Sequence, residues 1–453
     1  MNSEPVFATI TDLTAALRNG EISATQLIRL YRDRIEMLAA ASKAFISLDL
    51  ERAADRAEEI DAGSDADLPL AGIPYACKDL FDVAGTATTG GSNVLSDNIA
   101  RRDADSISRM NASGAIFIGK NNLHEFAYGA TGENQIYGTP PNPYDPARLT
   151  GGSSSGSAAA LAYGLCAMAL GTDTGGSVRA PAALCGLVGF KPTFGRISTD
   201  GVIPYSWSLD HVGTLTRSAA DAAILFEILA SHHQPAALPG LERLTIGIPR
   251  TFFFEHCDSE ILESLERLKT FLQNAGARLI PVEMPSMEYT RTVSLTVQMP
   301  EALSYHNRYL EQRGELYSAD FRAGLALGQC LLAEQYIRAK RFIESYRRDL
   351  DQVFAAVDLI LTPATPVIAP PIGAVEVSVE GLTEPAGNAI TRYTSFFNMT
   401  GHPAITLPCG MHSAGLPIAA QLIGRHHADE ILIESTRLIE QNYDFQLPLP
   451  PRL

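Results

Sequence analysis

The 453-residue chain is poor in cysteine pairs, in lysine and in positive charge. Its six cysteines are scattered and form no C-x-x-C pair, which argues against a disulfide framework or a cysteine-rich zinc site. It has 35 basic against 51 acidic residues, and the resulting charge of −16 disfavours nucleic acid as the main direct partner. No segment approaches the roughly 18 uninterrupted apolar residues of a membrane span. The N-terminus also lacks a basic stretch followed by an apolar one. We therefore expect a cytoplasmic protein that binds neither membranes nor nucleic acid directly.

What is present is ample apolar material arranged in alternating helical and strand-like segments. Hydrophobic residues make up 46% of the chain, enough for a large buried sheet. The alternation predicts an α/β fold with a mixed, mostly central sheet flanked by helices. The patterning is helical over 287–350, and 367–388 is a loop rich in proline and glycine. The one connection that looks exposed, 232–243, is too short to separate domains, so we expect a single large domain over 1–453.

Two glycine–serine clusters, GGSSSG and DTGGS, lie between Leu149 and Arg179. The second follows a predicted strand, and Gly175 and Gly176 leave the backbone around Ser177 bare. Consecutive backbone N–H groups at such a turn can hold a developing oxyanion, and the serine hydroxyl can be the nucleophile. The alternative interpretation is a packing turn.

The first cluster contains a G-x-S-x-G string centred on Ser154. In isolation it is read as a flexible loop. A nucleophile elbow requires a preceding strand, and the proline-broken segment PNPYDPARLT is not one.

Lys78 lies in the apolar segment GIPYACKDLF and is one of only six lysines. If it is solvated it stays charged, but burial would bring its pKa from about 10.4 toward 7–8 and let the neutral amine accept a serine proton. The histidines show no zinc spacing, so we expect no metal ion and no cofactor.

Taken together, Lys78, GGSSSG and GTDTGGSVRAPAALCGLVGFKPTFGR resemble the amidase signature family. The likeness is dense over 70–215, which we take as the signature core. It continues more loosely through NMTGHPAITLPCG and GLPIAAQLIG. The separations of 75 residues from Lys78 to Ser153 and of 24 residues from Ser153 to Ser177 also match the family pattern.

The resemblance implies a Ser–Ser–Lys triad. Ser177 would be the nucleophile, Ser153 a bridging serine in a cis peptide, and Lys78 the base. The resemblance further implies an oxyanion hole, supporting residues and a substrate-binding pair: the backbone N–H groups of Thr174, Gly175, Gly176 and Ser177; the side chains of Ser154, Asp173 and Arg179; and Phe126 with Ala127. The variable region 287–350 would shape the substrate pocket. Tyr205 and Trp207 either add an aromatic wall to that pocket or pack in the core.

We therefore expect a hydrolase that cleaves the C–N bond of linear carboxamides through an acyl-enzyme. Carbamates and esters present the same carbonyl, so urethanase and esterase activity are included in this expectation. The expected partner is a small-molecule amide, carbamate or ester, with no nucleic acid bound directly and no membrane, in a monomer or homodimer. The alternative is the amidase (A) subunit of a tRNA-dependent amidotransferase complex.

Overall fold

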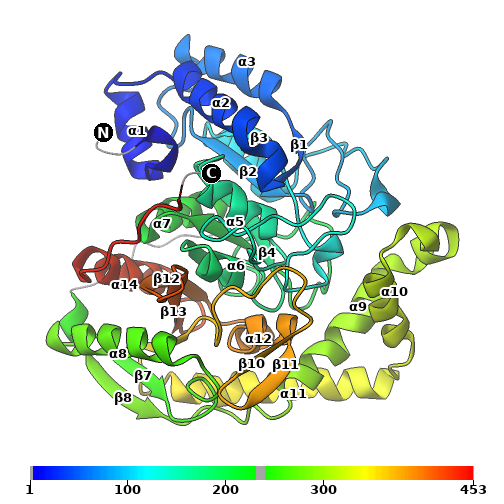
Figure 1. The fold of residues 1–453 in the computed structure, drawn as a ribbon, viewed down its shortest axis with the longest axis vertical. Helices are drawn as coiled ribbons and strands as arrows, with labels where there is room; N and C mark the ends of the chain where they lie inside the picture. Colours follow the sequence, from blue (N-terminus) through cyan, green and yellow to red (C-terminus); the bar gives the residue numbers. More distant parts are fainter. Residues whose placement is uncertain (1–3, 231–239, 452–453) are drawn as a thin grey trace.

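The computed structural model describes residues 4–230 and 240–451, and these residues form the predicted α/β fold (Figure 1). Eleven strands make one mixed sheet in the order β1-β3-β2-β4-β6-β5-β12-β13-β9-β7-β8, and β10 pairs with β11 in a separate hairpin. The strands are β1 (Phe45–Leu48), β2 (Pro74–Lys78), β3 (Ile116–Asn121), β4 (Met168–Asp173), β5 (Val188–Lys191), β6 (His211–Thr216), β7 (Thr245–Pro249), β8 (Arg278–Val282), β9 (Leu359–Pro363), β10 (Glu376–Val379), β11 (Leu382–Pro385), β12 (Ala404–Met411) and β13 (Pro417–Gly424).

Helices flank this sheet in Figure 1, and none of those described is both long and apolar enough to cross a membrane. The α-helices are α1 (Ile10–Arg18), α2 (Ala24–Ser42), α3 (Leu50–Asp61), α4 (Asp105–Ala112), α5 (Ser155–Ala162), α6 (Arg179–Leu184), α7 (Ala219–Leu229), α8 (Ser259–Asn274), α9 (Thr290–Arg313), α10 (Ala319–Gln329), α11 (Ala333–Val353), α12 (Ala386–Thr391), α13 (Phe396–Thr400) and α14 (Asp429–Asn442). Short 3₁₀ turns are η1 (Pro5–Phe7), η2 (Asn93–Leu95), η3 (Glu125–Ala127), η4 (Leu241–Arg243) and η5 (Gly314–Leu316).

The central strands are covered on both faces. Every residue of β2, β3, β4, β5, β6, β9 and β13 is buried, so side chains pointing to either side meet protein rather than water. Burial on both faces explains why these strands read as continuous apolar runs instead of alternating patterns.

Strand direction decides where the functional residues meet. β2 runs parallel to both of its neighbours, with Lys78 opposite Asn121 of β3 and Cys77 opposite Leu170 of β4. The carboxyl ends of β2 and β4 therefore lie at the same edge of the sheet, which is where open α/β sheets bind ligands. Lys78 ends β2, and the DTGGS cluster begins at the end of β4.

Two segments differ from the secondary structure expected from the sequence, and a third lies mostly outside the described residues. The stretch after the second glycine–serine cluster, expected as turns with packing glycines, contains α6 and β5. The predicted loop over 367–388 contains the β10–β11 hairpin, whose strands alternate exposed and half-buried residues. Most of the predicted exposed connection falls on residues 231–239, outside the described residues.

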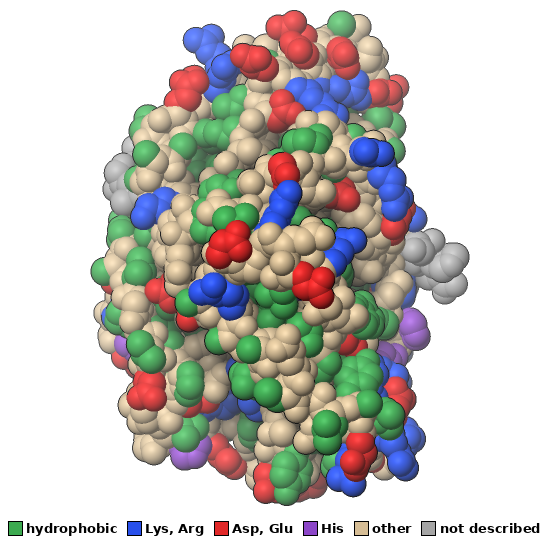
Figure 2. All heavy atoms as spheres, turned by 90° about the vertical axis from the view of Figure 1, so that its right-hand side faces the viewer, with side chains coloured by type: hydrophobic (Ala, Val, Ile, Leu, Met, Phe, Trp, Pro, Cys, Tyr) green, Lys and Arg blue, Asp and Glu red, His purple; other side chains and the backbone are tan. Residues whose placement is uncertain are grey.

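Helices α9, α10 and α11 occupy the region expected to be helical, and α9 with α10 extends to one side of the sheet in Figure 1. Viewed from that side, hydrophobic side chains are interspersed with charged ones over the surface (Figure 2). Large exposed apolar side chains in this region are Leu316, Leu327, Leu332, Ile337 and Phe342. The exposed fractions of Leu327 and Leu332 reach 56% and 63%.

Candidate active site

Lys78 is fully buried at the carboxyl end of β2, and among the described residues its side-chain nitrogen forms hydrogen bonds only with hydroxyl groups. Nζ lies 2.7 Å from Ser153 Oγ and 2.8 Å from Thr172 Oγ1. Burial lowers the pKa of Lys78 from 10.5 to about 7, and the carboxylates of Asp210 and Asp173 offset only part of that effect. A neutral amine is therefore well populated at neutral pH, as a base requires.

The carboxylate next to Lys78 in sequence is already engaged elsewhere. Asp79 Oδ1 lies 3.0 Å from Lys120 Nζ in an ion pair that is buried on both sides. Asp79 also accepts from the Thr89 backbone N–H at 2.9 Å. Asp79 is therefore paired with Lys120 and not with Lys78. An anion in direct contact with Lys78 would raise the pKa of its amine and keep it in the ammonium form.

Ser153 and Ser154 come from the loop that leads into α5. The Gly152–Ser153 peptide bond is cis, as the family resemblance implies. The Ser153 carbonyl accepts from His124 N–H at 3.1 Å. Ser154 Oγ donates to the Thr172 carbonyl at 3.3 Å, and Ser154 N–H donates to the Ser177 carbonyl at 3.3 Å. The two glycine–serine clusters are thus tied together through their backbones.

Ser177 is nearly buried and lines a cavity of about 200 Å³. Lys78 and Ser153 are hydrogen-bonded to one another, but within the described chain the Ser177 hydroxyl makes no hydrogen bond to Ser153. Catalytic hydrogen bonds are often long before substrate binds. The structure therefore contains the Lys78–Ser153 hydrogen bond of the predicted relay, and it does not contain the Ser153–Ser177 hydrogen bond.

Asp173 organises the loop that carries Ser177. Its carboxylate accepts from the backbone N–H groups of Gly176 and Val178 at 2.8 and 3.1 Å, and from Arg179 through two guanidinium nitrogens at 3.0 Å each. Asn398 Nδ2 donates to it at 2.8 Å. Burial acts to raise the pKa of Asp173, but the charge and hydrogen bonds of Arg179, with the bond from Asn398, outweigh it and hold the pKa below its usual range.

The loop presents three backbone donors, one fewer than the sequence predicts. The N–H groups of Thr174, Gly175 and Ser177 donate to no acceptor among the described residues. Gly176 N–H is committed to Asp173. Three of the four N–H groups predicted for the oxyanion hole thus have no acceptor among the described residues, and the role of all four stays a prediction.

Glycine is required at position 176. Its φ is +127°, and a Cβ placed there would lie 2.0 Å from Thr394 Oγ1. Thr394 Oγ1 in turn donates to the Gly175 carbonyl at 2.7 Å. A side chain at 176 would displace the hydroxyl that holds the loop in place.

The predicted substrate-binding pair separates in the structure. Ala127 lines the cavity, but Phe126 packs into an aromatic cluster with His306, at 4.4 Å between ring centroids, and with Phe321. Phe126 packs behind the site in this structure, and its predicted role in substrate binding stays a prediction. Tyr205 is buried and lines the cavity, whereas Trp207 is half exposed and does not line it. Further lining residues come from α9, α12 and neighbouring loops: Tyr128, Gly129, Ala130, Arg291, Leu295, Gln298, Met299, Gly387, Thr391 and Ser395.

Sequence reasoning missed several supporting residues. Arg179 NH1 donates to Gln421 of β13 at 2.6 Å, and NH2 donates to Asn398 of α13 at 2.7 Å. Thr172 is the second partner of Lys78. Asn398 and Gln421 stand in the otherwise apolar segments SFFNMTG and PIAAQLIG. A polar residue in a fully buried segment requires a partner, and that was the available signal.

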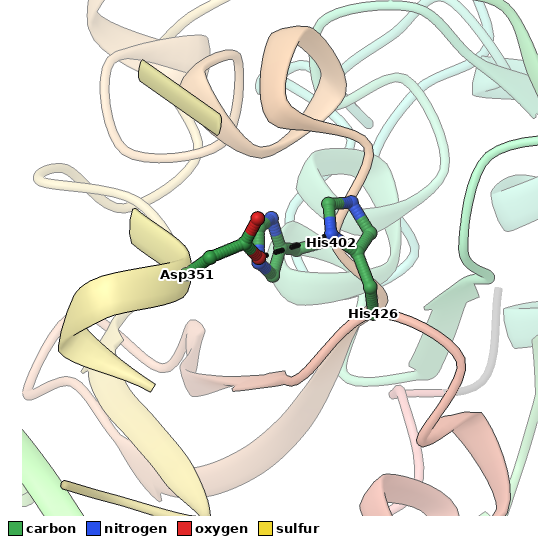
Figure 3. A group of neighbouring side chains, drawn as sticks. All are labelled: Asp351, His402 and His426. Carbon is green, nitrogen blue, oxygen red and sulfur yellow. Dashed lines mark hydrogen bonds and ion pairs between the residues drawn. The ribbon is translucent and has the colours of Figure 1, made fainter. Parts of the chain in front are cut away.

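A second titratable group, distant in sequence from the triad, joins Asp351 of α11 to His402 and His426 (Figure 3). Asp351 Oδ1 lies 3.1 Å from His402 Nε2 and 3.2 Å from His426 Nδ1, and the two rings stack at 3.7 Å. Such a set has the composition of a cation site. However, Arg347 donates to the Thr400 carbonyl that His426 also approaches, and its charge acts on both rings. We interpret the group as a hydrogen-bonded tie between α11 and the loops that flank β12 and β13.

This geometry provides the parts for acyl transfer: an amine that is partly neutral at pH 7, a hydroxyl in contact with it, a second hydroxyl lining a cavity, and backbone donors on the same loop that have no acceptor among the described residues. Among the described residues, no carboxylate or imidazole lines the cavity.

A sequence model of the family described as Amidase matches residues 26–433. The glutamyl-tRNA(Gln) amidotransferase A subunit of Coxiella burnetii (strain Dugway 5J108-111) is 34% identical over 98% of this chain and 99% of its own length. The corresponding protein of Koribacter versatilis, which carries the same name, is 34% identical over 95% and 98%.

Three solved structures are similar over nearly the whole chain. A chain of a vestigial protein complex that bears on the origins of an s-triazine catabolic enzyme has a TM-score of 0.91 at 30% identity, covering 97% of this chain and 100% of its own. An amidase crystal structure has a TM-score of 0.91 at 33% identity, with 96% and 100% covered. The glutamyl-tRNA(Gln) amidotransferase A subunit of Thermotoga maritima has a TM-score of 0.82 at 29% identity, with 99% of each covered.

These relatives contradict our expectation about partners. We expected small molecules alone, with no nucleic acid. The curated relatives are named as subunits of an amidotransferase that acts on a glutamyl-tRNA, so their names imply other subunits and an RNA. The acidic net charge misled that inference because it describes the average surface of one chain and does not report which contacts the other subunits of an assembly make.

Proposed function

The chain belongs to the amidase family, whose members are hydrolases of C–N bonds, and from this premise we propose that it is the ammonia-releasing subunit of an amidotransferase-type assembly. The observation that carries the proposal is the buried Lys78–Ser153 hydrogen bond beside a cavity that contains Ser177. Similarity over the full length to several A subunits supports the assembly part of the proposal.

The proposed reaction begins with proton transfer. Neutral Lys78 accepts a proton from Ser153, which accepts one from Ser177, and Ser177 Oγ attacks the carboxamide carbon. The N–H groups of Thr174, Gly175 and Ser177 stabilise the charge that develops on the carbonyl oxygen. Removing one such donor typically costs about 10²–10³ in rate.

The proton then returns to the leaving nitrogen as the C–N bond breaks. Ammonia departs, and the acyl group stays on Ser177 Oγ. Water attacks the ester through the same relay, which releases the carboxylic acid and restores the serine. The cycle balances with one water consumed for each amide.

The exposed apolar side chains of residues 316–342 support a partner subunit. Leu316, Leu327, Leu332, Ile337 and Phe342 all belong to the helical region beside the cavity. They are distributed over η5, α10, α11 and the turn between the two helices. Several large exposed apolar side chains in one region are a feature of interaction surfaces. A partner that covers them would lie next to the α9 residues that line the cavity.

The decisive experiment measures ammonia release from L-glutamine by a coupled dehydrogenase assay. The purified chain is compared alone, with the other amidotransferase subunits of the same organism, and with those subunits plus glutamyl-tRNA(Gln). We expect release to rise at each step. Equal rates in all three conditions contradict the amidotransferase assignment and leave the hydrolase chemistry intact.

A second candidate function is the hydrolysis of small carboxamides as an end in itself. It is favoured by the greater structural likeness to an amidase, with a TM-score of 0.91, than to the Thermotoga maritima protein, with 0.82. Carbamates and p-nitrophenyl esters are included in this candidate because they offer the same carbonyl to Ser177. A panel of amides, anilides, carbamates and esters separates it from glutamine-dependent ammonia release.

A further inference from the structure

Arg291 is the one charged side chain among the described residues that line the Ser177 cavity. It lies in the first turn of α9, and the remaining lining side chains are apolar, hydroxyl, phenol or amide groups. A cation in a cavity without an anion attracts a negatively charged group of the ligand.

Arg291 is not neutralised by a protein anion. Within the described chain it forms no hydrogen bond and no ion pair. The carboxylate that acts on it electrostatically, Glu384, is paired with Arg392. The phenols of Tyr205 and Tyr128 also act on Arg291 electrostatically. Burial raises the pKa of both phenols, so they stay uncharged.

Arg291 combines exposure to solvent with a place in the wall of the cavity. Arg291 is an exposed residue, yet enough protein surrounds it that burial lowers its pKa, which is the environment of a side chain on a concave wall. An arginine remains charged in such a place, and its planar fork matches a carboxylate with two hydrogen bonds.

The size of the cavity limits what can bridge Arg291 and Ser177. At about 200 Å³ it is smaller than the 300–1,000 Å³ typical of drug-sized ligands. One small molecule therefore spans it. No described acidic side chain lines the wall, so a substrate ammonium group has no partner there.

We propose that Arg291 forms a carboxylate subsite, and that the substrate is a small ω-carboxylated amide whose carboxylate is recognised and whose amino group, if present, is not. This inference rests on the proposed amidase function of Ser177. It narrows the substrate class to amides of dicarboxylic acids, with L-glutamine as one member.

The test compares glutaramate with pentanamide, which replaces the carboxylate by a methyl group on the same chain length. The wild type should favour glutaramate in kcat/KM by about 10- to 100-fold, the range expected for hydrogen bonds to a charged group. Arg291→Met should reduce that preference to about threefold or less, mainly through KM, while pentanamide turnover changes little. Arg291→Lys should restore part of it. The matched control is Arg308→Met, which removes an exposed arginine of the same helix that does not line the cavity.

A binding measurement covers the case in which the isolated chain turns over too slowly. Calorimetry on the Ser177→Ala variant should detect glutaramate binding. Adding Arg291→Met to this variant should weaken glutaramate binding at least tenfold and leave pentanamide binding unchanged. Equal handling of the charged and neutral amides by the wild type, or a preference that survives Arg291→Met, overturns the subsite and leaves the proposed function standing. If glutaramate binding depends on Arg291 but the protein hydrolyses no amide, the carboxylate subsite stands and the proposed amidase function is overturned.

Discussion

Replacing Lys78 by methionine should stabilise the protein at neutral pH while it abolishes catalysis. Lys78 is fully buried and has a pKa of about 7 against an ordinary value of 10.5. At 1.36 kcal/mol for each unit of pKa, that difference corresponds to about 5 kcal/mol of unfavourable burial of the ammonium form. Methionine removes this cost at similar volume and loses two hydrogen bonds, to Ser153 and Thr172, each contributing about 1 kcal/mol. The expected net gain at low pH is about 3 kcal/mol.

The sign of the pH dependence follows from which state binds the proton more tightly. Between pH 7 and 10.5 the unfolded chain holds a proton on Lys78 that the folded protein has released. Stability of the wild type therefore rises with pH across this window. Below pH 7 both states are protonated and the full cost of burial is present. Above pH 10.5 the lysine is neutral in both states and its burial carries no charge penalty. There the loss of the hydrogen bonds to Ser153 and Thr172 makes Lys78→Met less stable than the wild type.

The assay is the difference in melting temperature between Lys78→Met and the wild type from pH 6 to pH 10. For a chain of 453 residues, 1 kcal/mol corresponds to about 1 °C. Lys78→Met should melt about 3 °C higher near pH 6.5, and the difference should shrink and change sign as the pH approaches 10. Taking differences cancels the other titrating groups. Lys340→Met, at a partly exposed lysine of α11, provides the control for loss of a lysine and should show no crossing.

Catalysis gives an independent reading of the same pKa. Wild-type kcat/KM should rise through a midpoint near pH 7 and level off above it, because the neutral amine is the active form. Lys78→Met should retain less than about 1% of the rate. A melting-temperature difference that is constant with pH, together with a rate midpoint near 10, would refute the buried-base argument.

Three further substitutions test the loop around Ser177. Ser177→Ala should leave the melting temperature within about 1 °C of the wild type and remove ammonia release and fluorophosphonate labelling, because the Ser177 hydroxyl supplies the oxygen that the acyl group occupies. Gly176→Ala should lower kcat by about 100-fold or more, because φ is +127° and the new Cβ meets Thr394 Oγ1; steady-state kinetics with a melting curve separates this loss from unfolding. Asp173→Asn should lower stability by about 3–5 kcal/mol, measured by denaturant unfolding, because Arg179 is left buried without its anion.

Controls distinguish these effects from general damage. Asp200→Asn breaks an exposed ion pair with Arg102, which water screens, and should cost far less stability than Asp173→Asn. Thr394→Ala enlarges the space beside Gly176 without adding a side chain to the loop. If Asp173→Asn unfolds at the same denaturant concentration as Asp200→Asn, the buried pair does not organise the loop.

Much of the fold was predictable because its signals are local. The capping box of Ser23 and Gln26 is present at the start of α2, and α8 ends where the sequence places Gly276. The prediction missed β5, a four-residue strand that pairs with β12 far along the chain. It also missed the β10–β11 hairpin, whose strands alternate exposed and half-buried residues instead of forming an apolar run. The position of Arg291 in the cavity was also beyond prediction, since nothing in the first turn of α9 indicates which surface that helix approaches.

By itself, the sequence determined the residue types and spacings that place a lysine and two glycine–serine clusters in one chain, and with them the family and the α/β class. Only the tertiary structure decided which of those groups touch. Lys78 meets Ser153 because parallel strands end at a common edge, and Asp79 is removed from Lys78 because Lys120 of the next strand holds it. Phe126 packs against His306 of α9 instead of lining the cavity, and these two residues are also far apart in the chain. Contacts between segments far apart in the chain depend on packing, and packing is not written in any local pattern.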